Sequence, residues 1–197
     1  DVNDELELQR CLGIPLLRWS GRAPFGGVGC TASVQIAAAA IAAGVQHLPV
    51  QIVHNPQPDE GQASSLRQGL AACPASGPGG FDAFYIGLAD QPLIGSDEIA
   101  HLLTAHQQRP TGCAFTQPLV DNRPGNPVVF TQAVRQDLLQ ASGDWGGRQW
   151  QKAHADQVYR WPTPNPHYRI DMDSPEDLQA FTLRTGRALH WPAPGQA

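Results

Sequence analysis

Three short segments carry the side chains that could do chemistry, and the first is centred on Asp90. This residue directly follows the apolar run 84–89 and precedes Gln91 and Pro92. A carboxylate at the end of a strand places a hard oxygen ligand at a sheet edge, where open α/β folds bind their ligands. The position therefore suits a divalent cation and a phosphate group. Taken alone, Asp90 is also the residue type of a turn or a helix cap.

The second segment is the small-residue turn 61–65, which opens a predicted helix. Backbone N–H groups of Gly61 and its neighbours, with the hydroxyl groups of Ser64 and Ser65, would lie at the positive end of that helix. Such an arrangement favours an anion or the polar edge of a nucleotide. By itself, however, the segment is better explained as an ordinary N-cap.

The third segment holds Asp171 and Asp173, which precede Ser174 and Pro175. Side chains two positions apart on a strand point to the same face, so both carboxylates can meet one from a neighbouring strand end. Carboxylates that converge without arginine partners repel each other unless a divalent cation neutralises them. Together, the three segments predict a Mg²⁺ site and a substrate that carries phosphate.

Strands and helices alternate along the chain that must position these segments. Helices are predicted over 31–43, 64–72, 96–106, 132–140 and 147–154, with another beginning at 174–175. Strands are predicted over 48–54, 82–89, 113–115, 128–130 and 168–172, and a loop over 117–127. This alternation implies crossover connections, so we expect an α/β fold whose mainly parallel sheet has helices on both faces. The 197 residues suffice for a single domain over 1–197, with a frayed end at 191–197.

The composition argues against several classes of function. A formal charge of -5 gives no basic footprint for nucleic acid or an anionic membrane. No apolar run of about 18 residues could span a membrane, and the polar start is unlike a signal peptide, so a cytoplasmic location is expected. The four cysteines are widely spaced without a CxxC pair, which favours reduced thiols over a zinc site. A monomer is the default expectation.

Six short motifs, in this order, resemble those of the MobA-like NTP transferases. They are HNP at 54–56, EGQASSLRQGL at 60–70, LADQPL at 88–93, GNPV at 125–128, GDWGGR at 143–148 and IDMDSPEDL at 170–178. Within that superfamily, the chain looks most like the molybdenum cofactor cytidylyltransferases. The resemblance implies a Rossmann-like, three-layer α/β/α sandwich.

The same resemblance implies a reaction and a set of site residues. A nucleoside triphosphate, most simply CTP, would donate its nucleoside monophosphate to a phosphorylated acceptor such as molybdopterin, and pyrophosphate would leave. Asp90 would be the catalytic residue and a Mg²⁺ ligand, with Asp171 or Asp173 as the second acidic position near the metal. The nucleotide would contact Gly61, Ser64, Ser65 and Ala89. No protein nucleophile is required for such a transfer.

The acceptor side of the site is implied by the GNPV motif. Gly125, Asn126 and Pro127 would match a segment that commonly reads Gly-His-Pro in these enzymes. Asn126 replaces the histidine, which keeps a polar contact but removes a titratable group. Trp145, Trp150 and Trp161 could line an acceptor cleft, although aromatic residues at such spacings more often pack in a core or at its rim.

The first 28 residues depart from the family pattern, which opens with a glycine-rich signature followed by a lysine. Residues 1–28 hold arginines but no lysine, and they are too few for a strand, loop, helix and second strand, which need about 35 residues. An incomplete or altered start is favoured, because the downstream motifs are intact in form. A divergent member with impaired nucleotide binding is the alternative, and replacement of the signature by residues 20–27 is a third.

The departure leaves two functions open. One is Mg²⁺-dependent nucleotidyl transfer, and the other is a catalytically silent binding or regulatory module that keeps an acceptor pocket. The acidic positions Asp90, Asp171 and Asp173 favour the first, because a purely structural role would not need them.

Overall fold

The computed structural model describes residues 16–18, 51–57, 60–73, 81–88 and 90–187. Its sheet contains the strands β1 (Leu16–Arg18), β2 (Ala83–Ile86), β3 (Phe115–Val120), β4 (Arg123–Pro124), β5 (Val128–Thr131) and β6 (Val158–Pro162). The order across the sheet is β1-β2-β5-β3-β4, and β6 pairs with β3. The helix predicted over 31–43, the predicted frayed end 191–197 and nearly all of the divergent segment predicted over 1–28 lie outside the described residues.

The sheet is mixed rather than mainly parallel, which corrects one part of the expected α/β fold. Among the described strands, β5 lies antiparallel to both β2 and β3, and only β3 and β6 pair in parallel. The cause is the connection that follows β3. Asp121 and Asn122 have φ angles of 50° and 60°, which suits a two-residue hairpin turn, so the chain returns through β4 to β5 without a helical crossover.

Five helices are found close to their predicted positions. They are α3 (Gln62–Ala72), α4 (Ser96–Gln107), α5 (Gln132–Gln140), α6 (Gly147–Ala153) and α7 (Pro175–Thr185). Two 3₁₀ turns, η2 (Ala155–Gln157) and η3 (Pro166–Arg169), connect the later elements. The α7 helix has the clearest sequence signal, since the Ser174 hydroxyl oxygen accepts from the Asp177 N–H and a proline occupies the first turn.

Two strand predictions are wrong where the structure describes the chain, and a third strand was missed. Residues 51–54 are irregular, and residues 168–172 contain the end of η3 followed by irregular chain. The strand predicted over 168–172 does not form because a local turn replaces its start. The Asn165 side chain accepts from the His167 N–H at 3.0 Å, and Pro166 begins η3. The sequence analysis did not predict β6, and β3 extends into the stretch predicted as a loop.

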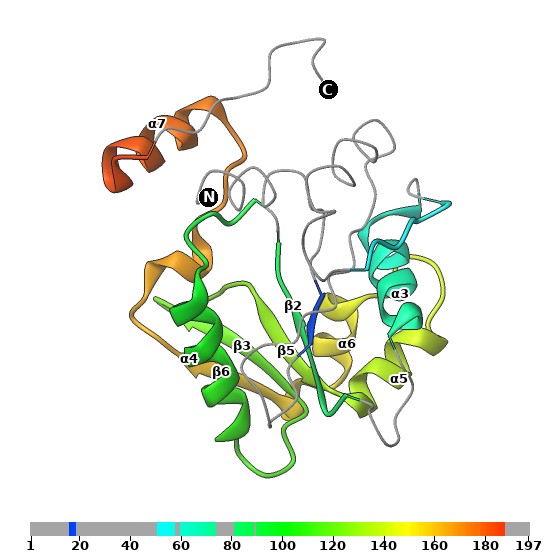
Figure 1. Cartoon of the computed structure of the whole chain (residues 1–197). Coiled ribbons are helices and arrows are strands. Elements are labelled where there is room, and N and C mark those ends of the chain that lie inside the picture. Colours follow the sequence, from blue (N-terminus) through cyan, green and yellow to red (C-terminus); the bar gives the residue numbers. More distant parts are fainter. Residues whose placement is uncertain (1–15, 19–50, 58–59, 74–80, 89, 188–197) are drawn as a thin grey trace.

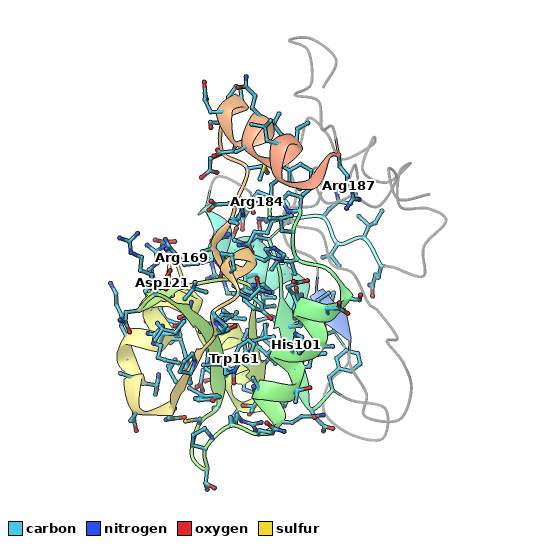
Figure 2. The ribbon with its side chains drawn as sticks, turned by 90° about the vertical axis from the view of Figure 1, so that its left-hand side faces the viewer. His101, Asp121, Trp161, Arg169, Arg184 and Arg187 are labelled. Carbon is cyan, nitrogen blue, oxygen red and sulfur yellow. The ribbon has the colours of Figure 1, made fainter. Side chains whose placement is uncertain are left out.

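Helices cover both faces of the sheet, so the predicted three-layer α/β/α arrangement is confirmed. In Figure 1, α3, α5 and α6 lie on one side of the sheet and α4 on the other, while α7 stands apart in both views (Figure 1, Figure 2). The first face is filled by a stack of rings that runs from Phe84 through Phe130 and Phe115 to Trp150, with centroids 5.6–5.9 Å apart. Leu102 and Leu103 of α4 pack on the other face.

Candidate active site

The register of β2 and β5 brings two of the predicted site segments to one edge of the sheet. Ile86, at the end of β2, pairs with Val128, at the start of β5. The chain leaving β2 toward Asp90 and the chain entering β5 from Gly125 therefore emerge at the same edge. This edge corresponds to the carboxyl ends of β2 and β3, which run in the same direction.

Three hydrogen bonds join these segments to the third one, residues 168–173. The Met172 N–H donates to the Asp90 carbonyl oxygen at 2.9 Å, and the Asn126 N–H donates to the Tyr168 carbonyl oxygen at 2.8 Å. The Gln91 Nε2 group also donates to the Tyr168 carbonyl oxygen, at 3.5 Å. The Asp90 segment, the 125–127 loop and the Asp171–Asp173 segment are thus held together, although they are separated by 35 residues or more along the chain.

The three aspartates of this edge interact electrostatically. Withdrawal of the carboxyl group from water raises the pKa of Asp90, and the charges of Asp171 and Asp173 raise it further, against a backbone hydrogen bond that lowers it. All three residues are exposed overall, so only part of the Asp90 carboxyl group is withdrawn from water. Because residues 170–173 form no strand, the alternation argument that placed Asp171 and Asp173 on one face does not apply.

The donor chemistry of these carboxylates fits a Mg²⁺ ion. Within the described ranges, no group of three or more His, Cys, Asp or Glu side chains is arranged to hold a metal ion. Mg²⁺ is commonly bound by only one or two protein carboxylates, with waters and substrate phosphates completing the shell. Asp90 with Asp171 or Asp173 would supply that number of hard oxygen ligands.

Gly125 is held by contacts on every side of its backbone. Its N–H donates to the Pro118 carbonyl oxygen at 2.9 Å, and its carbonyl oxygen accepts from Gln117 Nε2 at 3.1 Å. A Cβ atom at position 125 would lie 2.4 Å from the Tyr168 carbonyl oxygen, closer than atoms can approach. Only glycine therefore fits where the loop passes Tyr168. Gln117 is itself held by Arg160, whose Nη1 donates to Gln117 Oε1.

The serine turn at the start of α3 is fixed by Asn55. The Asn55 Nδ2 group donates to Ser64 Oγ at 2.7 Å and to Ser65 Oγ at 2.9 Å, and Asn55 is buried. Gly61, with a φ of 84°, is the N-cap residue and makes no side-chain cap, so neither serine is the N-cap. Ser64 is buried and also bonds to the Gly61 carbonyl oxygen at 2.9 Å, whereas Ser65 is half-buried. Of the two residues, Ser65 is the more exposed.

The GDWGGR motif packs against this turn. The Arg67 Nη1 group donates to the Trp145 carbonyl oxygen at 3.3 Å. A Cβ atom on Gly146 would lie 3.2 Å from the Ala63 Cβ atom, and one on Gly61 would lie 3.8 Å from Asp144 Oδ1. The predicted nucleotide-side residue Ala89 lies outside the described residues.

The three tryptophans have different environments. Trp150 is buried in the ring stack, and its Nε1 group donates to Asp137 Oδ2 at 2.8 Å. Trp161 packs edge-on against Tyr168, with ring centroids 5.6 Å apart. Trp145 is partly buried against the core and lines a hollow of about 490 Å³ with Asp137 and His154. Trp150 and Trp161 are therefore packing residues.

Sequence reasoning assigned no role to several residues that build this edge. Asn55 and Gln91 lay within the motifs that carried the family resemblance, so a signal for them existed. Tyr168 was read as part of a strand, and Gln117 as part of a loop. No local pattern marks either residue as a partner of the 125–127 loop, because their contacts are formed by tertiary packing.

Comparisons with known proteins decide the family. The MobA-like NTP transferase domain matches residues 8–158 of the sequence. The chain belongs to this family. Asp90 and the 125–127 loop lie inside the matched range, and Asp171 and Asp173 lie beyond it. No curated protein matches the sequence significantly.

Solved structures show the same fold. Rv0371c from Mycobacterium tuberculosis is 19% identical with a TM-score of 0.60, and the match covers 91% of this chain and 82% of that one. A nucleotidyl transferase from Methanothermobacter is 16% identical with a TM-score of 0.58, covering 79% and 73% of the two chains. A manganese complex of Rv0371c is 19% identical with a TM-score of 0.57, covering 91% and 84%. In the described part of the chain, no helix has the length and apolar character needed to cross a membrane.

Proposed function

We propose that this member of the MobA-like NTP transferase family transfers CMP from CTP to a phosphorylated acceptor such as molybdopterin, in a Mg²⁺-dependent reaction that releases pyrophosphate. The observation that carries the proposal is the meeting of Asp90, Asp171 and Asp173 at one sheet edge, beside the 125–127 loop. Their mutual repulsion is unfavourable in the free protein and would be relieved by a cation. A cytoplasmic monomer is part of the same proposal.

The cation would be held by Asp90 with Asp171 or Asp173. Mg²⁺ bound there offsets the charge of the triphosphate and of the leaving pyrophosphate. A manganese complex is named for one of the solved structures with this fold, which supports a divalent cation in the proposal. That structure is 19% identical, so the support extends to the class of ion and no further.

The remaining residues would orient the two substrates. The Ser65 hydroxyl, with Gly61, Ser64 and Ala89, would contact the nucleotide, and the 125–127 loop would contact the acceptor. A terminal phosphate oxygen of the acceptor forms a bond to the α-phosphorus of CTP. The bond from that phosphorus to the bridging oxygen breaks, and both electrons leave with pyrophosphate. Alignment of the two phosphates is the main task of the protein in such a transfer.

Asp90 provides the direct test of this proposal. Pyrophosphate release from CTP is measured with Mg²⁺ and molybdopterin for the wild type, for Asp90→Asn and for the control Asp156→Asn. The first substitution is expected to lower the rate by a factor of about 100 or more, because it removes an anionic ligand of the cation that would offset the negative charge developing on the leaving pyrophosphate. Asp156 is exposed in η2, before β6 and therefore at the other edge of the sheet, so its variant should keep the wild-type rate.

Calorimetry supplies the outcome that would contradict the proposal. A wild-type protein that binds none of CTP, GTP and ATP at millimolar concentration with Mg²⁺ is not a transferase in this form. The silent binding module is then the better description. Under that reading the acceptor still binds without nucleotide, and Gly125→Ala weakens its binding.

A further inference from the structure

The side chain of Gln91 is buried where the three site segments meet. The residue is 3% exposed, and its Nε2 group donates to the Tyr168 carbonyl oxygen. The same carbonyl oxygen accepts from the Asn126 N–H of the acceptor-side loop. The other end of the amide, Oε1, is buried and has no hydrogen-bond partner.

Gln117 shows what a structural glutamine looks like at the same edge. It is 8% exposed, its Nε2 group donates to the Gly125 carbonyl oxygen, and its Oε1 atom accepts from Arg160. Both ends of that amide are satisfied within the protein. A buried amide oxygen without a partner is unfavourable, and an apolar side chain of similar shape would avoid that penalty. The bond from Nε2 to the Tyr168 carbonyl oxygen accounts for the nitrogen end of the Gln91 amide, but packing does not explain its oxygen end.

We propose that Gln91 Oε1 accepts a hydrogen bond from an N–H or O–H group of the acceptor substrate. The inference rests on the proposed function and specifies its acceptor as a phosphorylated compound with such a donor near its phosphate. The acceptor is favoured over the nucleotide because Gln91 shares the Tyr168 carbonyl oxygen with Asn126 of the acceptor-side loop. No described contact joins Gln91 to the serine turn of α3. Gln91 is thus a specificity residue for the acceptor.

Unfolding by urea tests whether the oxygen is free, whatever the activity of the protein. Gln91→Met removes an unsatisfied acceptor together with the long donation of Nε2 to the Tyr168 carbonyl oxygen at 3.5 Å, and that oxygen keeps the Asn126 N–H as its donor. The unfolding midpoint should therefore stay close to that of the wild type. Gln117→Met, the matched control, breaks two satisfied contacts and should unfold at lower urea concentration. A midpoint for Gln91→Met that falls as far as that of Gln117→Met would overturn the proposal, because Oε1 would then belong to the fold.

Steady-state kinetics test whether the oxygen serves the acceptor. With molybdopterin as the acceptor, Gln91→Met should raise the KM for molybdopterin about tenfold and leave the KM for CTP unchanged. An unchanged KM for molybdopterin overturns the inference while the proposed function stands. A wild-type protein without pyrophosphate release instead refutes the proposed function, and the urea comparison still decides whether Oε1 is free.

Hydrogen exchange distinguishes a direct contact between Gln91 and the acceptor from an indirect effect of Gln91 through the 125–127 loop. The Asn126 N–H, which is bonded to the Tyr168 carbonyl oxygen, should exchange at the same rate in Gln91→Met and in the wild type. Faster exchange in the variant would show that Gln91 acts by holding the loop, and the proposed contact with the acceptor would be refuted.

Discussion

At the scale of single residues, the Tyr168 carbonyl oxygen fixes the 125–127 loop. It accepts from the Asn126 N–H and from Gln91, and it faces Gly125 so closely that no side chain fits between them. A backbone oxygen cannot turn aside as a flexible side chain can. The position of the loop is therefore set by backbone contacts, and the side chain of Asn126 remains available to face a ligand.

Replacement of Gly125 by alanine should displace this loop. The added Cβ atom would meet the Tyr168 carbonyl oxygen at 2.4 Å, so the backbone has to shift, at a cost of about 1–3 kcal/mol in the free energy of unfolding. Exchange of the Asn126 N–H should become faster. Urea unfolding and hydrogen exchange measure the two effects.

Gly147→Ala is the matched control for this substitution. A Cβ atom at position 147 meets nothing within 4 Å, and the residue begins α6 with an ordinary backbone conformation. Alanine there should be neutral or stabilise the protein by about 0.4–1 kcal/mol. Equal effects of the two substitutions would mean that the close approach at Gly125 does not constrain the loop.

The sequence identified the residues of this edge better than it identified their geometry. Asp171 and Asp173 were predicted to meet a carboxylate of a neighbouring strand end, and a backbone hydrogen bond from Met172 to Asp90 joins their segments. The strand argument that aligned Asp171 with Asp173 failed, because local capping at Asn165 and Pro166 turns the chain into η3 instead. Tyr168 was not recognised, since its role depends on a carbonyl oxygen that every residue possesses.

At the scale of elements, Glu98 connects α4 to η3. Its Oε2 atom accepts from the Gly95 N–H at 3.0 Å, and its Oε1 atom accepts from Asn165 at 3.1 Å and lies 2.8 Å from His167 Nδ1. The Tyr168 hydroxyl donates to the Glu98 carbonyl oxygen at 2.8 Å. Burial alone would raise the pKa of Glu98, but these hydrogen bonds outweigh it and hold the pKa below its ordinary value. The Glu98 carboxylate thus holds Asn165 and His167 of this turn, and the Glu98 carbonyl oxygen holds the Tyr168 hydroxyl.

Glu98→Gln should weaken this connection in a pH-dependent way. A carboxyl group whose pKa is lowered by folding stabilises the protein above its ordinary pKa of 4.5, and the contribution disappears as the pH falls through the folded value. At pH 7 we expect a loss of about 1–2 kcal/mol in the free energy of unfolding. The gap from the wild type should close below pH 4.5, as measured by urea unfolding at several pH values.

Glu60→Gln is the control for the charge change itself. Glu60 is exposed, so its substitution should alter the free energy of unfolding by no more than about 0.5 kcal/mol at any of these pH values. A gap between Glu98→Gln and the wild type that stays constant from pH 7 to pH 4 would contradict the assigned role of the Glu98 charge.

Elements with local signals were predicted well, and those without them were not. The helices α4 and α5 were found within one residue of their predicted bounds, and α7 begins at the predicted capping serine and proline. The strands β4 and β6 are short and contain prolines, so their assignment depends on pairing with β3. The direction of β5 depends on the hairpin turn at Asp121 and Asn122, which the sequence analysis read as part of a longer loop.

At the scale of the whole molecule, the α4 layer is attached to the sheet partly through a buried histidine. His106 of α4 is 4% exposed, and its Nδ1 atom lies 2.8 Å from the Thr116 hydroxyl oxygen of β3. Burial lowers the pKa of His106 to about 3, and the nearby charge of Arg109 lowers it further. Folding therefore requires the neutral form of an imidazole that binds a proton readily when the chain is unfolded.

This histidine should make the whole fold sensitive to mild acid. Because the unfolded state takes up the proton near pH 6.5 and the folded state only near pH 3, stability is full above pH 6.5 and falls as the pH drops below it. The expected loss in the free energy of unfolding is about 1.4 kcal/mol for each pH unit. The pH range from 6.5 to 5 isolates the contribution of His106, since the contribution of Glu98 to stability persists there.

His106→Asn should show a shallower dependence of the free energy of unfolding on pH, measured by urea unfolding. The control His101→Asn, whose residue is exposed on α4 (Figure 2), should keep the pH dependence of the wild type. Equal slopes for the wild type and His106→Asn would show that His106 does not set the acid sensitivity.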